Sequence, residues 1–128
     1  MRLLLDTCTF LWLGDGHARL SEESRRLCTD PGNEVLISVV SAWEISVKHT
    51  LRRLLLSEPP PTYVPKYRKL HGIETLPLEE EAALQLHRLP GLHNDPFDRM
   101  LVCQAIVHGL TILTPDPLII QYPVRTAW

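Results

Sequence analysis

Short apolar runs alternate with longer amphipathic stretches along the chain. The runs are bounded by polar or turn residues and are rich in leucine or β-branched residues, a pattern typical of buried strands. They occupy residues 2–6, 34–40 and 110–114, and a shorter run at 124–127 predicts a last strand at the edge of a sheet. A brief segment at 73–78 lies between the second and third of these runs.

Helical patterns fill the intervals between the runs. A first helix is predicted after Ser21, which is a suitable N-cap. Two glutamates near the start of this helix and two arginines further along give the charge order that a helix dipole favours. A second helix is predicted from Ser41 until the prolines at 59–61 stop it, because its apolar residues recur at helical spacing. These apolar residues are Trp43, Val47, Leu51 and Leu54. Shorter helices are predicted at 9–13, before a Gly-Asp-Gly loop, and at 79–89.

The helix predicted over 95–108 is apolar on almost every side. Asp95 and Pro96 suit its N-cap and first position, and capping is the role that we assign mainly to Asp95. Seven of the eight residues 100–107 are apolar, so hardly any side is left for water. Such a helix, together with near-continuous apolar strands, is typical of an α/β domain whose mainly parallel sheet is covered on both faces.

The composition is that of one ordinary globular domain. The chain has 128 residues, 45% of them hydrophobic, and a formal net charge of −2, so a polyanion would need a local basic patch. The three cysteines are odd in number and lack a C-x-x-C spacing, which fits a reducing compartment. Without a signal-peptide core or a long apolar run, we expect a single cytoplasmic domain over 1–128 that does not enter a membrane.

Four acidic residues fall at equivalent places on this predicted scaffold. Two follow strands directly, and two lie in the first turns of helices that follow strands. In a parallel sheet these places meet at one edge, which is where α/β folds bind ligands. The four are Asp6, Glu44, Asp98 and Asp116.

Most of these acids also have a purely structural interpretation. Glu44 would complete a capping box with Ser41 and form an i,i+4 pair with Lys48. The helix dipole would stabilise Asp98, and Asp116 stands between two prolines as a turn residue would. A structural interpretation fits Asp6 least well, because a carboxylate at the end of a buried strand is costly to desolvate without a partner.

A cluster of four carboxylates has a chemical consequence. Carboxylates about 5 Å apart repel each other by roughly 3 kcal/mol per pair at an effective dielectric constant near 20. Such a cluster therefore needs protons or a cation. The sequence places no histidine or cysteine to join it, and oxygen ligands alone favour Mg²⁺ or Mn²⁺ over zinc. A metal held in this way polarises a phosphoryl oxygen and lowers the pKa of a bound water, which predicts phosphodiester hydrolysis.

Four stretches carry a resemblance to a known family in their order and spacing. They are "LLLDTCTFLWL", "ISVVSAWEISVKHTLRRLLL", "HNDPFDRMLVCQA" and "LTILTPDPLI". They resemble the PIN-domain ribonucleases, and most of all the "DPFDR" subgroup of VapC-type toxins from prokaryotic toxin–antitoxin pairs. The combination of "DPFDR" with "S-x-W-E-I-x-x-K" is more specific than any single acid, and the likeness spans nearly the whole chain.

The resemblance implies a three-layer α/β/α fold, a divalent ion in an acidic pocket and an RNA substrate. It maps the same four acids onto the family's acidic quartet, with Asp6 and Asp98 as the firmest metal ligands. Glu44 and Asp116 would complete the pocket, through waters or a second ion. Asp95 matches a further acid of the subgroup. The resemblance also implies a homodimer, neutralised by an antitoxin whose basic side chain enters the acidic site.

Two positions depart from the family pattern. Cys8 stands where relatives often carry histidine, and we assign it no role beyond packing. A proline precedes Asp116 where a longer polar residue is common. Because this proline could displace the carboxylate, Asp116 is the least secure of the four.

The basic residues gather in the segment 48–71, which holds six of the chain's 13 and a single acid. They are Lys48, Arg52, Arg53, Lys66, Arg68 and Lys69. Tyr63 and Tyr67 lie among them and could stack on unpaired RNA bases, worth about 1–3 kcal/mol each. The segment also fits a solvated helical face with two half-buried tyrosines, or a surface for the antitoxin. For Arg99 we favour an ion pair with a neighbouring acid over a phosphate contact.

The histidines show neither metal-ligand nor nucleophile–base spacing. His93 is near enough to Asp95 in sequence to cap or orient it, but we favour the interpretation that it is a surface residue. This favours metal-activated water, which leaves a 5′-phosphate, over attack by the RNA 2′-hydroxyl. An aspartyl-phosphate phosphatase would need a second acid where Cys8 stands. The sequence thus predicts a Mg²⁺- or Mn²⁺-dependent endoribonuclease. The alternative is a PIN-like module that binds RNA or protein without cutting.

Overall fold

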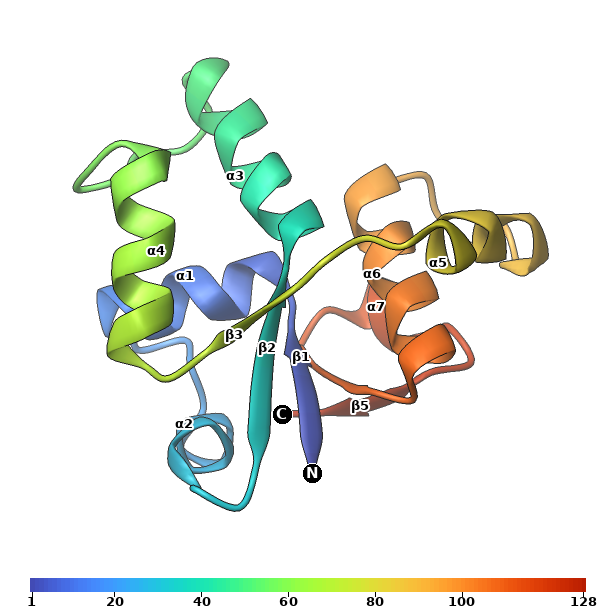
Figure 1. Cartoon of the computed structure of the whole chain (residues 1–128), viewed down its shortest axis with the longest axis horizontal. Helices are drawn as coiled ribbons and strands as arrows, with labels where there is room; N and C mark the ends of the chain where they lie inside the picture. Colours follow the sequence, from blue (N-terminus) through green and yellow to red (C-terminus); the bar gives the residue numbers. More distant parts are fainter.

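The central sheet consists of five parallel strands. The computed structural model describes all 128 residues of the chain. Its strands are β1 (Arg2–Leu5), β2 (Glu34–Ser38), β3 (Glu74–Leu76), β4 (Thr111–Leu113) and β5 (Arg125–Ala127). They lie in the order β3-β2-β1-β4-β5, and every neighbouring pair is parallel (Figure 1). The predicted α/β architecture is confirmed, and so is the edge strand near residue 125.

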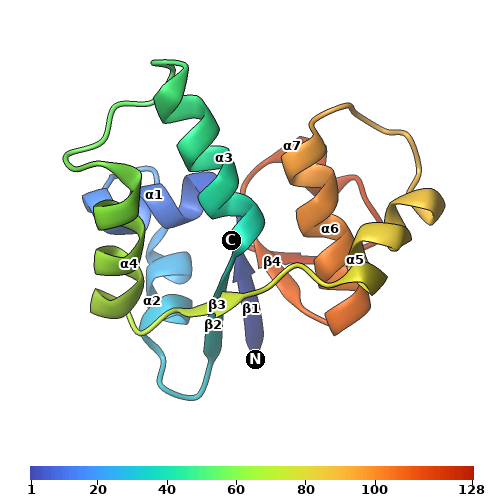
Figure 2. The same cartoon turned by 45° about the horizontal axis from the view of Figure 1, so that its top comes forward.

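Helices cover both faces of this sheet. They are α1 (Thr7–Asp15), α2 (Glu22–Thr29), α3 (Val39–Thr50), α4 (Pro60–Leu70), α5 (Glu80–Gln85), the 3₁₀ turn η1 (Leu86–Arg88), α6 (Pro96–His108) and α7 (Pro117–Ile120). On one side lie α1, α2 and α4, and on the other lie α5, α6 and α7 (Figures 1 and 2). The result is the three-layer α/β/α arrangement that the resemblance implied. No helix has both the length and the apolar character needed to cross a membrane.

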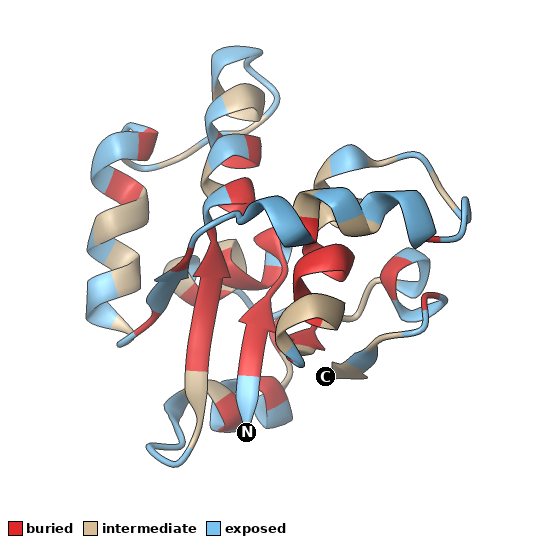
Figure 3. Cartoon of the chain, turned by 45° about the vertical axis from the view of Figure 1, so that its right-hand side comes forward, coloured by how far each residue is buried: buried red, intermediate tan, exposed pale blue.

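Two separate hydrophobic clusters fill the spaces between sheet and helices. The strand β1 serves both, because its successive side chains point to opposite faces: Leu4 joins one cluster, and Leu3 and Leu5 join the other. All three leucines are fully buried, and the two central strands are buried over most of their length in Figure 3. A rigid, doubly covered centre therefore carries the strand ends at which the acids lie.

The helix α6 agrees with its prediction. Asp95 is its N-cap, Pro96 its first residue and Gly109 its left-handed C-cap, with φ of 65°. No residue of 100–107 is exposed, and 101–105 are all buried. The prediction of a helix that is buried on almost every side is thus confirmed.

The start of α3 differs from the prediction. The N-cap is Ser38, whose hydroxyl accepts a hydrogen bond from the Val40 backbone N–H at 3.0 Å. Ser41 lies inside the helix, so the predicted capping box between Ser41 and Glu44 is wrong. Strand β2 pairs with β3 only as far as Ser38, and the hydroxyl at this last paired residue supplies the cap.

The buried face and the end of α3 also differ from the prediction. Trp43 and Leu51, expected on the buried face, are 59% and 56% exposed, whereas Glu44 and Ile45 are buried. The helix ends at Thr50, well before the prolines. Arg52 adopts a left-handed conformation with φ of 58°, which an α-helix cannot continue through.

Helix α7 was not predicted, and α4 was predicted only in the alternative interpretation of the basic segment as a helical face. Helix α4 begins at Pro60, because prolines in a first turn have no intrahelical N–H partner to lose. It also contains Pro65, which gives up one backbone hydrogen bond. Helix α7 has only four residues and also starts with a proline, capped by the Asp116 carboxylate. Prolines read as helix stops in the sequence therefore mark helix starts in the structure.

Gly14 does not begin a loop but lies within α1, where Tyr63 leaves no room for a side chain. A Cβ atom there would lie 2.7 Å from the Tyr63 hydroxyl oxygen. Tyr63 cannot move away readily, because it is fully buried and its hydroxyl donates to the Asp15 carboxylate at 2.8 Å.

We therefore expect Gly14→Ala to lower the free energy of unfolding by about 1–3 kcal/mol, although alanine normally favours a helix by about 1 kcal/mol over glycine. Urea denaturation measures the loss. In a Tyr63→Phe background the same substitution should be less harmful, because the clashing oxygen is gone. An equal loss in both backgrounds would contradict this explanation.

Candidate active site

The four predicted acids lie at the carboxyl-terminal edge of the parallel sheet. Asp6 follows β1 and caps α1, and Asp116 follows β4 and caps α7. Glu44 lies on α3, which continues directly from β2, and Asp98 lies in the first turn of α6. Figure 1 shows α3 and α6 rising on either side of this edge. All four acids thus lie at the predicted edge, but Glu44 is the sixth residue of α3 and not in its first turn as predicted, because the helix begins at Val39.

Asp6 is held by hydroxyl and amide donors. It is 4% exposed and accepts hydrogen bonds from the Thr9 backbone N–H at 2.8 Å and from the Thr114 hydroxyl at 2.5 Å. The same Thr114 oxygen accepts from the Asp116 backbone N–H at 3.0 Å, which ties the first and fourth acids together. Burial raises the pKa of Asp6, and the nearby charge of Asp116 adds to the rise.

Glu44 is buried and has a polar partner at each oxygen. The Thr7 hydroxyl donates to Oε1 at 2.6 Å, and the Lys48 ammonium pairs with Oε2. This confirms the predicted i,i+4 pair. Because the single Thr7 hydroxyl proton goes to Glu44, the Ser41 hydroxyl donates to Thr7, at 2.9 Å. Lys48 is therefore a cation of the acidic edge itself and not of a distant basic surface.

Asp98, like Asp6, has a raised pKa. Burial raises its pKa to about 6, and the charges of Asp95, Glu44 and Asp116 act in the same direction. A hydrogen bond with the His93 ring, 3.3 Å from Nε2 to Oδ2, opposes the rise. The influence of three other acids on one carboxyl group shows that all of them lie within electrostatic reach of it.

Asp95 is the N-cap of α6, as predicted. Its Oδ1 accepts hydrogen bonds from the backbone N–H groups of Phe97, at 2.9 Å, and Asp98, at 3.0 Å. Its charge nevertheless raises the pKa of both Asp98 and Lys48. Asp95 therefore caps the helix and also adds negative potential to the acidic edge.

The donor set suits a hard divalent cation, because the four acids offer only carboxylate oxygens. The raised pKa of Asp6 and Asp98 shows that two of these carboxylates lack a sufficient positive partner. As the side chains stand, no three histidine, cysteine, aspartate or glutamate residues lie close enough to hold a metal between them. Metal binding at this edge is therefore a proposal, and it requires adjustment of the side chains or bridging waters.

Two residues near the acids were misjudged from the sequence. Cys8 is not a packing residue but is exposed. Although Cys8 has an exposed surface, neighbouring atoms partly remove its sulfur from water. This desolvation, and then the charges of Asp6 and Glu44, raise the pKa of the thiol to about 11, so it is not a thiolate nucleophile at neutral pH. His93 is not a surface residue, because its side chain is only 9% exposed and contacts Asp98. No spacing signal in the sequence distinguished either residue.

Arg99 forms no ion pair with an acid, in contrast to our expectation. Its Nη1 donates to the Pro90 carbonyl at 2.9 Å, the His93 carbonyl at 3.2 Å and the Tyr122 hydroxyl at 3.0 Å. Arg99 therefore holds the loop before α6 in place.

The structure divides the basic segment. Tyr63 is fully buried, so the idea that it stacks on RNA bases is wrong. Tyr67 is partly buried against it, with ring centroids 4.5 Å apart. Lys66 pairs with Glu58 at 2.9 Å. The basic residues that keep exposed side chains and have no ion pair are Arg52, Arg53 and Lys69, and Arg68 is partly buried.

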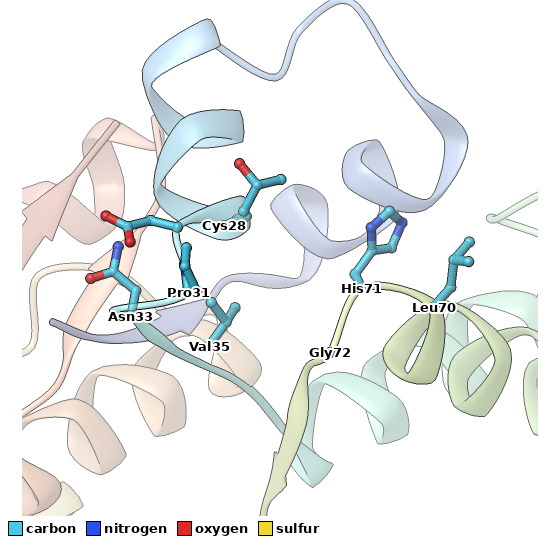
Figure 4. A pocket seen from close by; sticks show the side chains of 9 residues that line it. Cys28, Pro31, Asn33, Val35, Leu70, His71 and Gly72 are labelled. Carbon is cyan, nitrogen blue, oxygen red and sulfur yellow. The ribbon is translucent and has the colours of Figure 1, made fainter.

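The larger hollows of the molecule do not contain the four acids. One hollow, of about 420 Å³, lies at the opposite edge of the sheet, between the end of α2 and the end of α4 (Figure 4). Its lining includes Cys28 and His71. Another, of about 480 Å³, lies beside α3 and α6 and includes Trp43 and Met100. The four acids are thus outside both of these hollows.

Comparison with known proteins identifies the family. The PIN-domain model matches residues 3–123. The chain belongs to the PIN-domain family. Ribonuclease VapC16 of Mycobacterium tuberculosis is 34% identical in an alignment 90 residues long, which covers 64% of this PIN domain and 62% of the relative. The matched part is thus less than two thirds of that relative.

Solved structures share the fold over nearly the whole length. VapBC2 from Rickettsia felis, bound to a promoter DNA fragment, aligns with a TM-score of 0.75 and 15% identity, covering 99% of this PIN domain and 98% of that chain. VapBC-5 from Mycobacterium tuberculosis, described as a toxin–antitoxin system, aligns with a TM-score of 0.62 and 20% identity, covering 98% and 95%. At these identities the likeness shows the fold.

Proposed function

We propose that this PIN domain is a divalent-metal-dependent endoribonuclease and the toxin of a toxin–antitoxin pair. The observation that carries the proposal is the meeting of Asp6, Glu44, Asp98 and Asp116 at one sheet edge, where burial and mutual repulsion raise the pKa of Asp6 and Asp98. The similarity to a ribonuclease supports the choice of reaction. Cleavage would be hydrolysis of a phosphodiester by water and would leave a 5′-phosphate.

Asp6 and Asp98 are the residues that would hold Mg²⁺ or Mn²⁺ most directly, with Glu44 and Asp116 completing the site. A bound metal would supply Lewis acidity and lower the pKa of a water molecule. Within the chain, Thr114 and the Thr9 amide orient Asp6. Thr7 and Lys48 orient Glu44. These contacts hold the carboxylates of Asp6 and Glu44 in defined orientations before a metal binds.

RNA contact is assigned to basic residues that have no other partner. Arg52, Arg53 and Lys69 are exposed and unpaired. Arg52 and Arg53 follow α3, the helix that carries Glu44, whereas Lys69 lies near the end of α4, beside the hollow at the opposite edge of the sheet. They are suited to phosphate contacts, which supply sequence-independent affinity. Lys48, Lys66 and Arg99 are less suited, because they already bind Glu44, Glu58 and the loop before α6.

A protein partner and self-association are part of the same proposal. The solved relatives are VapBC and FitAB complexes, so we propose a cognate antitoxin for this chain and a homodimer. Exposed apolar side chains such as Trp43, at 59%, and Leu55, at 95%, offer surface for such contacts. The three free cysteines fit the proposed cytoplasmic location.

The proposal is tested by incubating purified protein with labelled total RNA, in Mg²⁺ or Mn²⁺ and in EDTA, and typing the product ends. We expect cleavage that requires the metal and leaves 5′-phosphates. Cyclic-phosphate ends or cleavage in EDTA would contradict the metal mechanism. RNA binding without any cleavage would identify the alternative, a PIN module that binds without cutting.

A further inference from the structure

We propose that His93 is a positioning residue for Asp98, which it orients through a ring N–H whose place is fixed by Tyr122 and Arg99. The proposal rests on the role of Asp98 in the proposed function. It concerns three residues that nothing in the four-acid site explains. They come from the loop before α6, from α6 itself and from the segment after α7.

The ring of His93 bridges two side chains. Its Nε2 lies 3.3 Å from Oδ2 of Asp98, and its Nδ1 lies 2.7 Å from the hydroxyl oxygen of Tyr122. The His93 side chain is 9% exposed and Tyr122 is 3% exposed. A ring enclosed to this extent has few alternative orientations, so the two contacts define its position.

The hydrogen bonds to Tyr122 decide which ring nitrogen carries the proton. The Tyr122 hydroxyl oxygen accepts from Nη1 of Arg99 at 3.0 Å and from the backbone N–H of His93 at 3.2 Å. A phenol has two lone pairs and one proton. Both lone pairs are occupied by donors, so the proton of Tyr122 goes to Nδ1 of His93. The neutral ring therefore carries its own proton on Nε2, where it points at Asp98.

The opposite tautomer would be unfavourable. A proton on Nδ1 would bring a third donor to the Tyr122 oxygen and leave a lone pair of Nε2 facing the Asp98 carboxylate. Arg99 cannot relieve this conflict, because a guanidinium has no acceptor. The arginine thus determines the tautomer of a histidine that it contacts only through the tyrosine and the backbone.

The consequence for Asp98 is an oriented carboxylate. One oxygen, Oδ2, is held by His93, while Oδ1 accepts no hydrogen bond within the chain. A carboxylate fixed on one side presents its other oxygen in a defined direction. In metal sites, partners of this kind change metal affinity or activity about 10- to 100-fold when they are removed.

The first experiment examines the ring without metal. Long-range ¹H–¹⁵N spectra of the imidazoles, recorded at about pH 8, where ordinary histidines are neutral, distinguish the two tautomers. We expect His93 as the Nε2–H form in the wild type and a mixture of forms in Tyr122→Phe, which keeps the buried ring. An Nδ1–H form in the wild type, or no response to Tyr122→Phe, would overturn the proposal.

The second experiment measures Mn²⁺ affinity by calorimetry. We expect His93→Ala to weaken binding about tenfold, and His93→Gln to restore it to within about threefold, because its amide N–H can replace Nε2–H. His87→Ala, on the exposed 3₁₀ turn, is the matched control. Unchanged affinity in His93→Ala would overturn the proposal. So would equal losses in the Ala and Gln variants, since these would indicate ring packing alone.

The two experiments separate this inference from the proposed function. A wild type that binds Mn²⁺ and cuts RNA, but whose His93→Ala variant binds equally well, refutes only the role of His93. A wild type that binds no Mn²⁺ and cuts no RNA refutes the proposed function. In that case an Nε2–H ring that responds to Tyr122→Phe still supports the positioning of Asp98.

Discussion

Asp6→Asn should reduce the rate of metal-dependent RNA cleavage by about 100-fold or more. A carboxylate that binds a catalytic metal contributes to the stabilisation of transition-state charge by that metal, which amounts to several kcal/mol. Each loss of about 1.4 kcal/mol slows the reaction about tenfold. Asparagine removes the charge but keeps an oxygen that can accept from the Thr9 amide. The helix cap on α1 therefore survives. Initial rates on one labelled RNA, at saturating Mg²⁺, measure the loss.

The control for this prediction is Asp30→Asn. Asp30 is exposed and follows α2, at the opposite edge of the sheet. Its side chain binds the Gly32 amide at 2.8 Å, so the substitution makes the same chemical change in a similar local role. It should leave the rate unchanged. If Asp6→Asn retained more than about a tenth of the wild-type rate while remaining folded, Asp6 would not be a metal ligand.

The stability of the metal-free protein should fall as the pH rises from about 4 to about 6. Asp98 has a pKa of about 6 in the folded protein, against 3.8 ordinarily. In this window the folded state keeps a proton that the unfolded state has lost, so raising the pH favours unfolding. The shift corresponds to about 3 kcal/mol once the pH exceeds both values. The raised pKa of Asp6 acts with the same sign.

Comparison with Asp98→Asn isolates this contribution. Asparagine is neutral at every pH, so the stability of the variant relative to the wild type should grow by about 3 kcal/mol between pH 4 and pH 7. Urea denaturation in a chelating buffer measures the difference at each pH. A difference that stays constant would mean that the Asp98 carboxylate bears no desolvation penalty. If Asp98 bears the penalty, Mn²⁺ should raise the free energy of unfolding of the wild type at pH 7 and leave that of Asp98→Asn unchanged.

The placement of the acids followed from the sequence because it depends on topology. Once the apolar runs are recognised as parallel strands, Asp6 and Asp116 must share an edge with the first turns of the helices that follow strands. The ends of β1 and β4 are visible in the sequence as polar residues after apolar runs, at Asp6 and Thr114. The end of β2 was not visible, because the apolar run continues through Val40 into α3. Likewise, the pattern around α6 is apolar on so many sides that only a buried helix fits it.

Features that depend on contacts between distant segments were missed. Ser41 and Ser38 are both good caps, and only the pairing of β2 with β3 decides between them. Tyr63 was interpreted from the sequence as a residue that stacks on RNA or is half-buried, but contacts with Gly14, Phe10 and Tyr67 bury it fully. His93 owes its role to Tyr122, which lies 29 residues further along. No local pattern records a partner at such a distance.

The hydrogen bond between Asp6 and Thr114 joins positions that are 108 residues apart. During synthesis, Asp6 and Glu44 are made first, and β4, which places Thr114 and Asp116 beside β1, follows only after α6. A nascent chain that ends before residue 111 therefore lacks a hydroxyl donor for Asp6 and the fourth acid. The acidic edge is completed only after translation has passed Asp116. For most of its synthesis, the nascent chain on the ribosome therefore lacks the complete site.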